Sequence, residues 1–347
     1  MIEIDGTFGE GGGQILRTSL ALSALTGQPF QIARIRGRRA KPGLHRQHLT
    51  SVLAAQQIAE AEVRGAELGS HELTFIPRRL AGGEFRFDIQ TAGSAMLVLQ
   101  TVLPPLFHAE HPAVVTVRGG THNPMSPPFD HFAETFAPAI ARMGSRVRAR
   151  LIGHGFFPAG GGEVVAEIEP ARAPAPTDFV PPTGPVVLSA RVLLARLPDR
   201  VWENEKRALE SLGLEFAAIE RRNITDSAGP GNCVEIVVDR GQGEQRSRSV
   251  LTAFGERGRP SAAVVAEVAG YARDLIAHPE AAVDRFLADQ LLVYLAMAGG
   301  GSLTTSTLSL HATTNTAVIE RFMPVRFETQ EENGVWRVRC EKRAGES

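Results

Sequence analysis

The stretch GGGQILRTSLALSAL at residues 11–25 places three glycines directly before a largely apolar segment, which predicts a tight turn followed by a helix. A short strand is expected at residues 30–35, then a polar loop at 36–43 and an amphipathic helix from Leu44, followed by another strand. The chain therefore begins with one supersecondary unit of two helices and short strands.

Two further copies of this unit are expected. The second has a turn at 92–93, a helix at 94–107, a strand at 113–117, a loop at 119–128 and a helix from Phe129. The third has a helix at 286–297, a glycine turn at 299–301, a strand at 303–308, a loop at 311–316 and then residues 317–322. Repetition with the loops on one side predicts a shared core and a common rim where function can sit.

A segment of different texture, residues 184–278, separates the second and third copies and is entered through a stretch rich in Pro and Ala at 171–185. Strands are expected at 186–195, 214–219, 233–238 and 249–254, with helices at 199–212 and 261–276. We expect an α/β fold of the α+β type. Its large repeat domain would comprise 1–183 and 279–347, with a small inserted α/β domain at 184–278. The alternative, a separate C-terminal domain from Gly184, would leave His311 remote from the N-terminal basic residues.

The bulk properties favour an ordinary globular chain. Its 347 residues suggest about two domains, and 43% of them are hydrophobic. No apolar run approaches the roughly 20 residues of a membrane helix, and the start lacks the features of a signal peptide, so we expect a cytoplasmic protein with no membrane partner. Cys233 and Cys340 lie far apart without a CxxC motif, which argues against a disulfide framework and a thiolate zinc site.

Basic residues are concentrated near the N-terminus although the net charge is only -1. No Asp or Glu occurs between Gln14 and Ala59. The Lys and Arg residues of this block are Arg17, Arg34, Arg36, Arg38, Arg39, Lys41 and Arg46. Part of the block lies in a loop that opens a helix, where free N–H groups favour anions, so phosphate binding is one interpretation. A solvated surface is the other.

Common nucleotide-binding motifs are excluded. The run from Gly9 to Gln14 lacks the third glycine of a dinucleotide fingerprint, and the next acid after Glu10 is Glu60. No lysine stands in a Walker A loop or in the Lys-x-Asp-Gly context of common ligases. A covalent nucleotide would need another nucleophile, and His311 is the natural candidate because its unperturbed pKa of about 6.5 leaves it neutral at pH 7. Thr313 to Thr316 are expected to cap the following helix, although a lone loop histidine is more often structural.

Long motifs support that candidate. They are residues 10–17, 38–44, 46–49, 93–94, 97–101, 155–162, 287–291 and 311–315. In this order they strongly resemble the RNA 3'-terminal phosphate cyclases over nearly the whole chain. The resemblance implies three repeated α/β units in a pseudo-threefold arrangement with a smaller inserted α/β domain.

The resemblance also implies roles for residues. His311 would be adenylylated through Nε2. Glu10 would lie near the triphosphate and a divalent metal, Mg²⁺ or Mn²⁺. The positions similar to the family's ATP-binding residues are Glu10, Gln100, Phe286, Leu287, Ala288, Asp289 and Gln290, with the ring of Phe286, where members often have Tyr, stacking on adenine. Basic positions expected to face ATP phosphates or the RNA end are Arg17, Arg38, Lys41 and Arg46.

The implied reaction converts an RNA 3'-terminal phosphate to a 2',3'-cyclic phosphate with ATP, through a histidine–AMP and an RNA-3'-pp-5'A intermediate. Two alternatives stay open. The chain could be a non-catalytic relative that assists ribosome assembly, although such relatives lack the nucleophilic histidine. It could also adenylylate other nucleic-acid phosphate ends. The residues do not indicate an oligomeric state.

Overall fold

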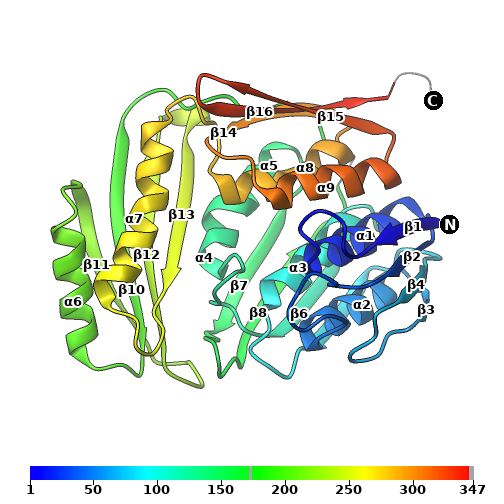
Figure 1. The fold of residues 1–347 in the computed structure, drawn as a ribbon, viewed down its shortest axis with the longest axis horizontal. Coiled ribbons are helices and arrows are strands. Elements are labelled where there is room, and N and C mark those ends of the chain that lie inside the picture. The colour runs from blue at the N-terminus through cyan, green and yellow to red at the C-terminus, as the bar shows by residue number, and fades with distance from the viewer. Residues whose placement is uncertain (172–173, 344–347) are drawn as a thin grey trace.

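Residues 1–171 and 174–343 are described by a computed structural model, in which three four-stranded sheets repeat one topology (Figure 1). Each unit runs β-α-β-α-β-β. Its first two strands pair in parallel, whereas the last two strands form an antiparallel hairpin that joins the sheet through the fourth strand. The expected fold class, α/β of the α+β type with repeated units, is confirmed.

The first unit has the sheet order β1-β2-β4-β3. Its elements are β1 (Ile2–Asp5), α1 (Gly13–Thr26), β2 (Phe30–Ala33), α2 (Arg46–Ile58), β3 (Glu62–Arg64) and β4 (Leu73–Ile76). Helix α1 ends at Gly27, whose φ of 71° is the left-handed conformation that glycine adopts without a steric penalty. Leu16 and Leu20 of α1 are fully buried, so this helix belongs to the core.

The second unit has the order β5-β6-β8-β7. Its elements are β5 (Gly83–Asp88), α3 (Ala95–Leu106), β6 (Ala113–Gly119), α4 (Phe129–His131), a π-helical turn (Phe132–Phe136), α5 (Ala137–Arg142), β7 (Val147–Gly153) and β8 (Gly162–Ile168). The Ser94 hydroxyl caps α3 by accepting from the Leu97 N–H at 3.2 Å. The π turn directly follows His131.

The third unit is split in sequence. Its sheet order is β9-β14-β16-β15, and β9 comes before the inserted segment whereas the other strands come after it. The elements are β9 (Thr177–Asp178), α8 (Arg285–Met297), β14 (Gly300–Thr305), α9 (Leu310–Phe322), β15 (Val325–Glu332) and β16 (Val335–Lys342). The expected loop at 311–316 is wrong, because α9 already begins at Leu310.

The inserted segment folds in the expected order β-α-β-β-β-α. It contains β10 (Val186–Ala195), α6 (Asp199–Glu210), β11 (Phe216–Ile224), β12 (Gly231–Arg240), β13 (Ser247–Phe254) and α7 (Ser261–Ala277), with sheet order β11-β10-β12-β13. Leu209 of α6 and Val268 of α7 are buried in a core that is separate from the core shared by the three repeats. We propose the boundaries 184 and 278 for this domain.

The insert contacts the second unit through buried polar groups. Arg191 of β10 lies 2.6 Å from Glu134 and 2.9 Å from Glu235. His122 and Asp130 of the second unit converge on the same buried Glu235. The carboxylates surround the Arg191 guanidinium, and this cluster joins the insert (left in Figure 1) to the repeats.

Within the described residues, no helix is long and apolar enough to cross a membrane.

Candidate active site

His311 lies in the first turn of α9, directly after the N-cap residue Ser309 and Leu310. The Ser309 hydroxyl accepts from the Ala312 N–H at 2.9 Å. The expected capping by residues 313–316 is therefore wrong. The Thr314 hydroxyl instead donates to the carbonyl of Leu310 within the helix. The consequence for His311 is a rigid position at a helix N-terminus, where free amides favour negative charge.

The glycine-rich turn of the first unit meets this helix start. His311 Nδ1 lies 2.6 Å from Gln14 Oε1, and the N–H of Glu10 donates to Thr314 Oγ1 at 2.9 Å. Deeper in the contact, Thr18 Oγ1 donates to Asn315 Oδ1 at 2.7 Å. His311 therefore lies close to the N-terminal segment that carries the basic block. A separate C-terminal domain would have placed it far from these residues.

Glu10 is the carboxylate nearest to the histidine ring among the ion pairs of the described chain. Its Oε1 lies 3.9 Å from His311 Nε2, and its side chain is only 7% exposed. Arg39 forms an ion pair with the same carboxylate. A Cβ added at Gly12 would overlap Glu10 Oε1 and Oε2, so a larger residue there would displace this carboxylate. Glu10 and Arg39 thus form an ion pair, with a buried carboxylate and a partly exposed guanidinium, beside the half-exposed imidazole.

Positive charge next to His311 acts on its protonation. Burial lowers the pKa of His311 below 6.5, and the nearby Arg17 and Arg39 lower it further because they disfavour an imidazolium. Burial lowers the pKa of Arg17 to about 10, which still leaves Arg17 charged at neutral pH. The site therefore combines a neutral imidazole with fixed cations, an arrangement suited to attack on an anionic phosphate.

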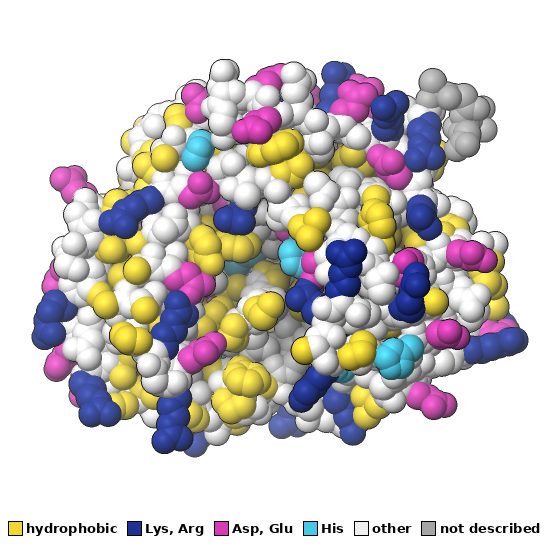
Figure 2. All heavy atoms as spheres, in the orientation of Figure 1, with side chains coloured by type: hydrophobic (Ala, Val, Ile, Leu, Met, Phe, Trp, Pro, Cys, Tyr) yellow, Lys and Arg dark blue, Asp and Glu magenta, His cyan; other side chains and the backbone are white. Residues whose placement is uncertain are grey.

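The other basic residues predicted to bind phosphates, Arg38, Arg46 and Lys41, differ in the groups that they contact. Arg38 donates from Nη1 to the carbonyl of Gly9 at 2.9 Å, so it contacts the turn that carries Glu10. Arg46 reaches the second unit, where it donates to Gln90 Oε1 at 3.1 Å. Lys41 is exposed on the loop before α2. Figure 2 shows a hollow near the middle of the face in view, with a histidine and several Lys or Arg side chains at its edge.

Helix α8 carries the run expected to bind the nucleotide. Its N-cap residue Asp284 accepts from the N–H groups of Phe286 and Leu287 at 3.0 Å. Phe286 is 37% exposed, and its ring meets Tyr271 of α7 edge-on with centroids 5.1 Å apart. Leu287 and Ala288 are buried in the core, where they anchor the helix. The guanidinium carbon of Arg285 lies 5.9 Å from the centroid of the same ring, so the partly exposed Phe286 has a cation over one face.

Asp289 connects this helix to the nucleophile helix. The Ser309 hydroxyl donates to Asp289 Oδ1 at 2.7 Å while it caps α9. Burial raises the pKa of Asp289 to about 6, and the Ser309 hydrogen bond opposes that rise. At the next residue of α8, Gln290 Oε1 accepts from Gln100 Nε2 at 2.8 Å. Gln100 of α3 therefore contacts Gln290 of α8, whereas the neighbouring Asp289 contacts Ser309.

Sequence reasoning missed several residues of this site. Gln14 lies inside the quoted glycine motif and Arg39 inside the basic block, but neither was given a role. Ser309 has the sequence signal of a helix cap, a serine three residues before the amide that it accepts from. Thr314 and Asn315 were expected to cap the following helix, whereas their side chains contact the first unit.

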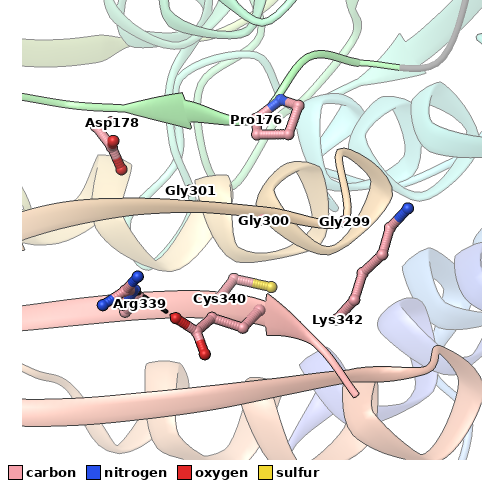
Figure 3. A pocket seen from close by; sticks show the side chains of 9 residues that line it. Pro176, Asp178, Gly299, Gly300, Gly301, Arg339, Cys340 and Lys342 are labelled. Carbon is pink, nitrogen blue, oxygen red and sulfur yellow. Dashed lines mark ion pairs between the residues drawn. The ribbon is translucent and has the colours of Figure 1, made fainter. Parts of the chain in front are cut away.

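A shallow pocket elsewhere contains none of these residues. It lies along the third sheet, between β9, the turn at Gly299 and β16 (Figure 3). Its lining includes buried Cys340 and the ion pair of Arg339 with Glu341, whose atoms lie 2.6 Å apart. The glycines at 299–301 follow the C-terminal end of α8, whereas Phe286, Asp289 and Gln290 lie in the N-terminal half of that helix.

Three β-α-β-α-β-β units with a fourth sheet inserted into the third define the class of protein, an α/β repeat protein with a histidine-centred site. The sequence model of a family described as RNA 3'-terminal phosphate cyclase matches residues 8–329. The chain belongs to the RNA 3'-terminal phosphate cyclase family, which confirms the resemblance and the expectation of an enzyme.

Curated relatives of that name support the assignment. The protein of Koribacter versatilis (strain Ellin345) is 47% identical over 97% of this chain and 94% of its own length. That of Salmonella paratyphi C (strain RKS4594) is 45% identical over 99% of this chain and 98% of its own length. That of Ralstonia nicotianae (strain ATCC BAA-1114 / GMI1000) is 46% identical over 98% of this chain and 96% of its own length. The similarity spans the three units and the insert alike.

Proposed function

We propose that this enzyme converts an RNA 3'-terminal phosphate to a 2',3'-cyclic phosphate at the expense of ATP, with His311 as a covalent AMP carrier. The observation that carries the proposal is the position of His311. Gln14 holds its Nδ1 at 2.6 Å, and its Nε2 is directed toward Glu10 and the arginines. The names of the relatives supply the RNA substrate class.

In the first step, the lone pair of His311 Nε2 attacks the α-phosphorus of ATP. A P–N bond forms, the bond to the bridging oxygen breaks, and pyrophosphate leaves. The Gln14 amide oxygen accepts from Nδ1–H and so stabilises the positive charge that develops on the ring. Arg17 and the amides at the start of α9 face the negative charge on the phosphoryl oxygens. The neutral ring favoured by the low pKa of His311 is the reactive form.

In the second step, an oxygen of the RNA 3'-phosphate attacks the AMP phosphorus, and His311 leaves. This gives an RNA-3'-pp-5'A end. In the third step, the neighbouring 2'-hydroxyl attacks the 3'-phosphorus, loses its proton, and expels AMP to close the cyclic phosphate. The last step is intramolecular, so the reacting groups are already in proximity. Arg38, Lys41 and Arg46 are the exposed cations proposed for the phosphates of ATP and of the RNA end.

Glu10 is the residue proposed to hold Mg²⁺ or Mn²⁺. Its two buried oxygens accept no hydrogen bond within the described chain, and their ion-pair partners there are Arg39 and the more distant His311 Nε2. One protein carboxylate with substrate phosphates is a usual ligand set for Mg²⁺. When bound, such an ion neutralises charge on the triphosphate. Arg39 holds the carboxylate in place by charge and can turn toward the phosphates.

Phe286, Gln100, Asp289 and Gln290 are proposed to bind the nucleoside of ATP. The exposed ring of Phe286 supplies a stacking face, which for nucleic-acid bases is worth about 1 to 3 kcal/mol. Because Phe286 is 37% exposed, replacement by Ala should weaken ATP binding without opening a core cavity. Asp289 and the two glutamines supply polar groups beside that ring.

The test is turnover of ATP with defined RNA ends. Purified protein is incubated with α-labelled ATP and RNA that ends in 3'-phosphate, with 3'-hydroxyl RNA and a strand with a 2'-deoxy terminal sugar and a 3'-phosphate as matched controls. We expect AMP release and a cyclic end only with the first RNA, and a stable adenylylated end with the deoxy sugar. AMP release at equal rates with the 3'-hydroxyl RNA would contradict the proposal.

A further inference from the structure

Two large apolar side chains are exposed next to the segments that carry His311 and Glu10. Leu310, the residue before His311 and the first of α9, is 59% exposed. Phe8, two residues before Glu10, is 47% exposed. Neither side chain belongs to the hydrophobic cores that the described residues form. Both are therefore free to contact a ligand.

The backbone of Phe8 is held by two successive turns. The Phe8 N–H donates to the carbonyl of Asp5 at 3.1 Å, and the Phe8 carbonyl accepts from the Gly11 N–H at 2.9 Å. The backbone at Phe8 is thus fixed relative to Glu10 before a ligand binds. Such preorganisation reduces the conformational entropy that is lost on binding.

One threonine joins this turn to the start of α9. The Thr314 hydroxyl accepts from the Glu10 N–H at 2.9 Å and donates to the Leu310 carbonyl at 2.6 Å. A Cβ added at Gly9 would overlap Thr314 Oγ1, so the close approach of the two segments depends on a glycine there. Phe8 and Leu310 therefore belong to two segments that are in direct contact.

The proposed chemistry determines where the RNA end lies. His311 Nε2 is the nucleophile in the first step and the leaving group in the second, and the attacking and leaving groups at phosphorus are roughly in line. The oxygen of the RNA 3'-phosphate therefore attacks from the position that pyrophosphate has left, opposite Nε2. Because Nε2 is directed toward Glu10 and its partner Arg39, these residues face that position.

The terminal nucleoside of the RNA is attached directly to this phosphate, so it comes to lie beside the turn that carries Glu10 and Phe8. Cations are present there for the phosphates of the strand, since Arg38 donates to the Gly9 carbonyl at 2.9 Å and Arg39 pairs with Glu10. An aromatic ring next to cations is the combination that binds single-stranded nucleic acids. The cations attract the backbone, and the ring stacks on a base.

We propose that Phe8 stacks on the base of the 3'-terminal nucleotide of the RNA, with Leu310 as apolar surface beside it. This rests on the proposed function and names the part of the substrate that this side of the site binds. The adenine of ATP is proposed to lie elsewhere, at Phe286 of α8. Since the side chains of Phe8 and Leu310 carry no polar atom, the contact requires a base but accepts every base.

The test is a double-mutant cycle between the ring and the base. Single-stranded RNA with a 5' fluorescent label and a 3'-phosphate is compared with the same RNA whose terminal nucleotide lacks its base, and protein is titrated into each while anisotropy is recorded. The variants are Phe8→Ala and Phe8→Tyr, which keeps the ring. Leu53→Ala is the matched control, because Leu53 is 41% exposed in the middle of α2.

We expect the wild type to bind the RNA with the terminal base at least about fivefold more tightly than the RNA without it. In Phe8→Ala this ratio should fall to about one, whereas Phe8→Tyr and Leu53→Ala should keep it. A purely structural effect of Phe8→Ala would weaken the binding of both RNAs equally and leave the ratio at the wild-type value, which would overturn the proposal. So would a wild type that binds the two RNAs equally.

Labelled ATP added to the same proteins tests the proposed function separately. If the binding ratios behave as expected but no AMP joins the wild-type protein, the proposed function fails and the contact with the terminal base stands. If AMP joins the protein and reaches the RNA while Phe8→Ala keeps the wild-type ratio, the proposed function stands and the contact is excluded.

Discussion

His311 Nδ1 lies 2.6 Å from Gln14 Oε1, although the two residues are 297 positions apart in the chain. The contact joins the first turn of α9 to the first turn of α1. Since an amide oxygen only accepts, Nδ1 carries the ring proton and Nε2 keeps its lone pair. One hydrogen bond thus fixes both the tautomer and the direction of the proposed nucleophile.

Gln14→Ala should slow formation of the His311 adenylate by on the order of tenfold to a hundredfold, because the ring loses its orientation and its preferred tautomer. The measurement is the single-turnover rate of labelled AMP transfer from ATP to protein. Gln28→Ala is the matched control, since Gln28 joins the other end of α1 to the Phe322 carbonyl at 2.7 Å. The control should adenylylate normally. Equal rates of AMP transfer to the protein in Gln14→Ala and Gln28→Ala would show that Gln14 does not position His311.

Arg39→Ala should move the acid limb of the adenylylation rate to higher pH. Arg39 lowers the pKa of His311 and neutralises Glu10, so its removal leaves a carboxylate 3.9 Å from Nε2 without a counter-charge. Both effects favour the imidazolium, which cannot attack. Activity is therefore lost on acidification at a higher pH than in the wild type. A limb at an unchanged or lower pH would contradict this assignment.

Asp289→Asn should stabilise the fold at alkaline pH. The pKa of Asp289 is about 6 in the folded state against 3.8 as its ordinary value, so the folded form opposes ionisation. A carboxyl group whose pKa is higher in the folded than in the unfolded protein stabilises the fold at pH values below its unfolded-state pKa. This contribution is lost as the pH rises through its folded-state pKa. Asn should raise the free energy of unfolding by up to about 3 kcal/mol at pH 8. In urea titrations the gain should shrink at pH 5; an equal gain at both pH values would exclude this cause.

Alanine at Arg38, Lys41 or Arg46 should reduce turnover with little change in melting temperature, because exposed charges contribute little to stability. Variants at ATP-facing positions should form less His311 adenylate, whereas variants at RNA-facing positions should form it normally but fail to pass AMP to the RNA. Loss of an RNA phosphate contact should also flatten the salt dependence of RNA binding. If all three variants carry out both half-reactions at wild-type rates, these residues form a solvated surface and do not bind the phosphates.

Local patterns predicted the insert well. The alternating run at 186–195 is β10, and the order of the following elements was also right. Strand β9, with only Thr177 and Asp178, was missed because two residues carry no periodicity. Its partner β14 is supplied from beyond the insert, so only tertiary pairing defines it.

The start of α9 was misplaced for a local reason. A run of Thr and Asn at 313–316 has the composition of a cap, but Ser309 is nearer the strand and satisfies the first free amide. Gln14 and Arg39 could not be assigned from spacing, because their roles depend on packing of the first unit against the third. The motif resemblance located the region, and the contacts identify which side chains in it meet His311.

The most direct measurement is the fate of labelled AMP in His311→Asn. The variant should hold no AMP on the protein and form no cyclic ends from 3'-phosphate RNA and ATP, while it still closes a preformed RNA-3'-pp-5'A end at a measurable rate, because that step needs no nitrogen nucleophile. The wild-type adduct should be acid-labile and stable in alkali, as a phosphoramidate is. Retention of labelled AMP by His311→Asn would contradict the account.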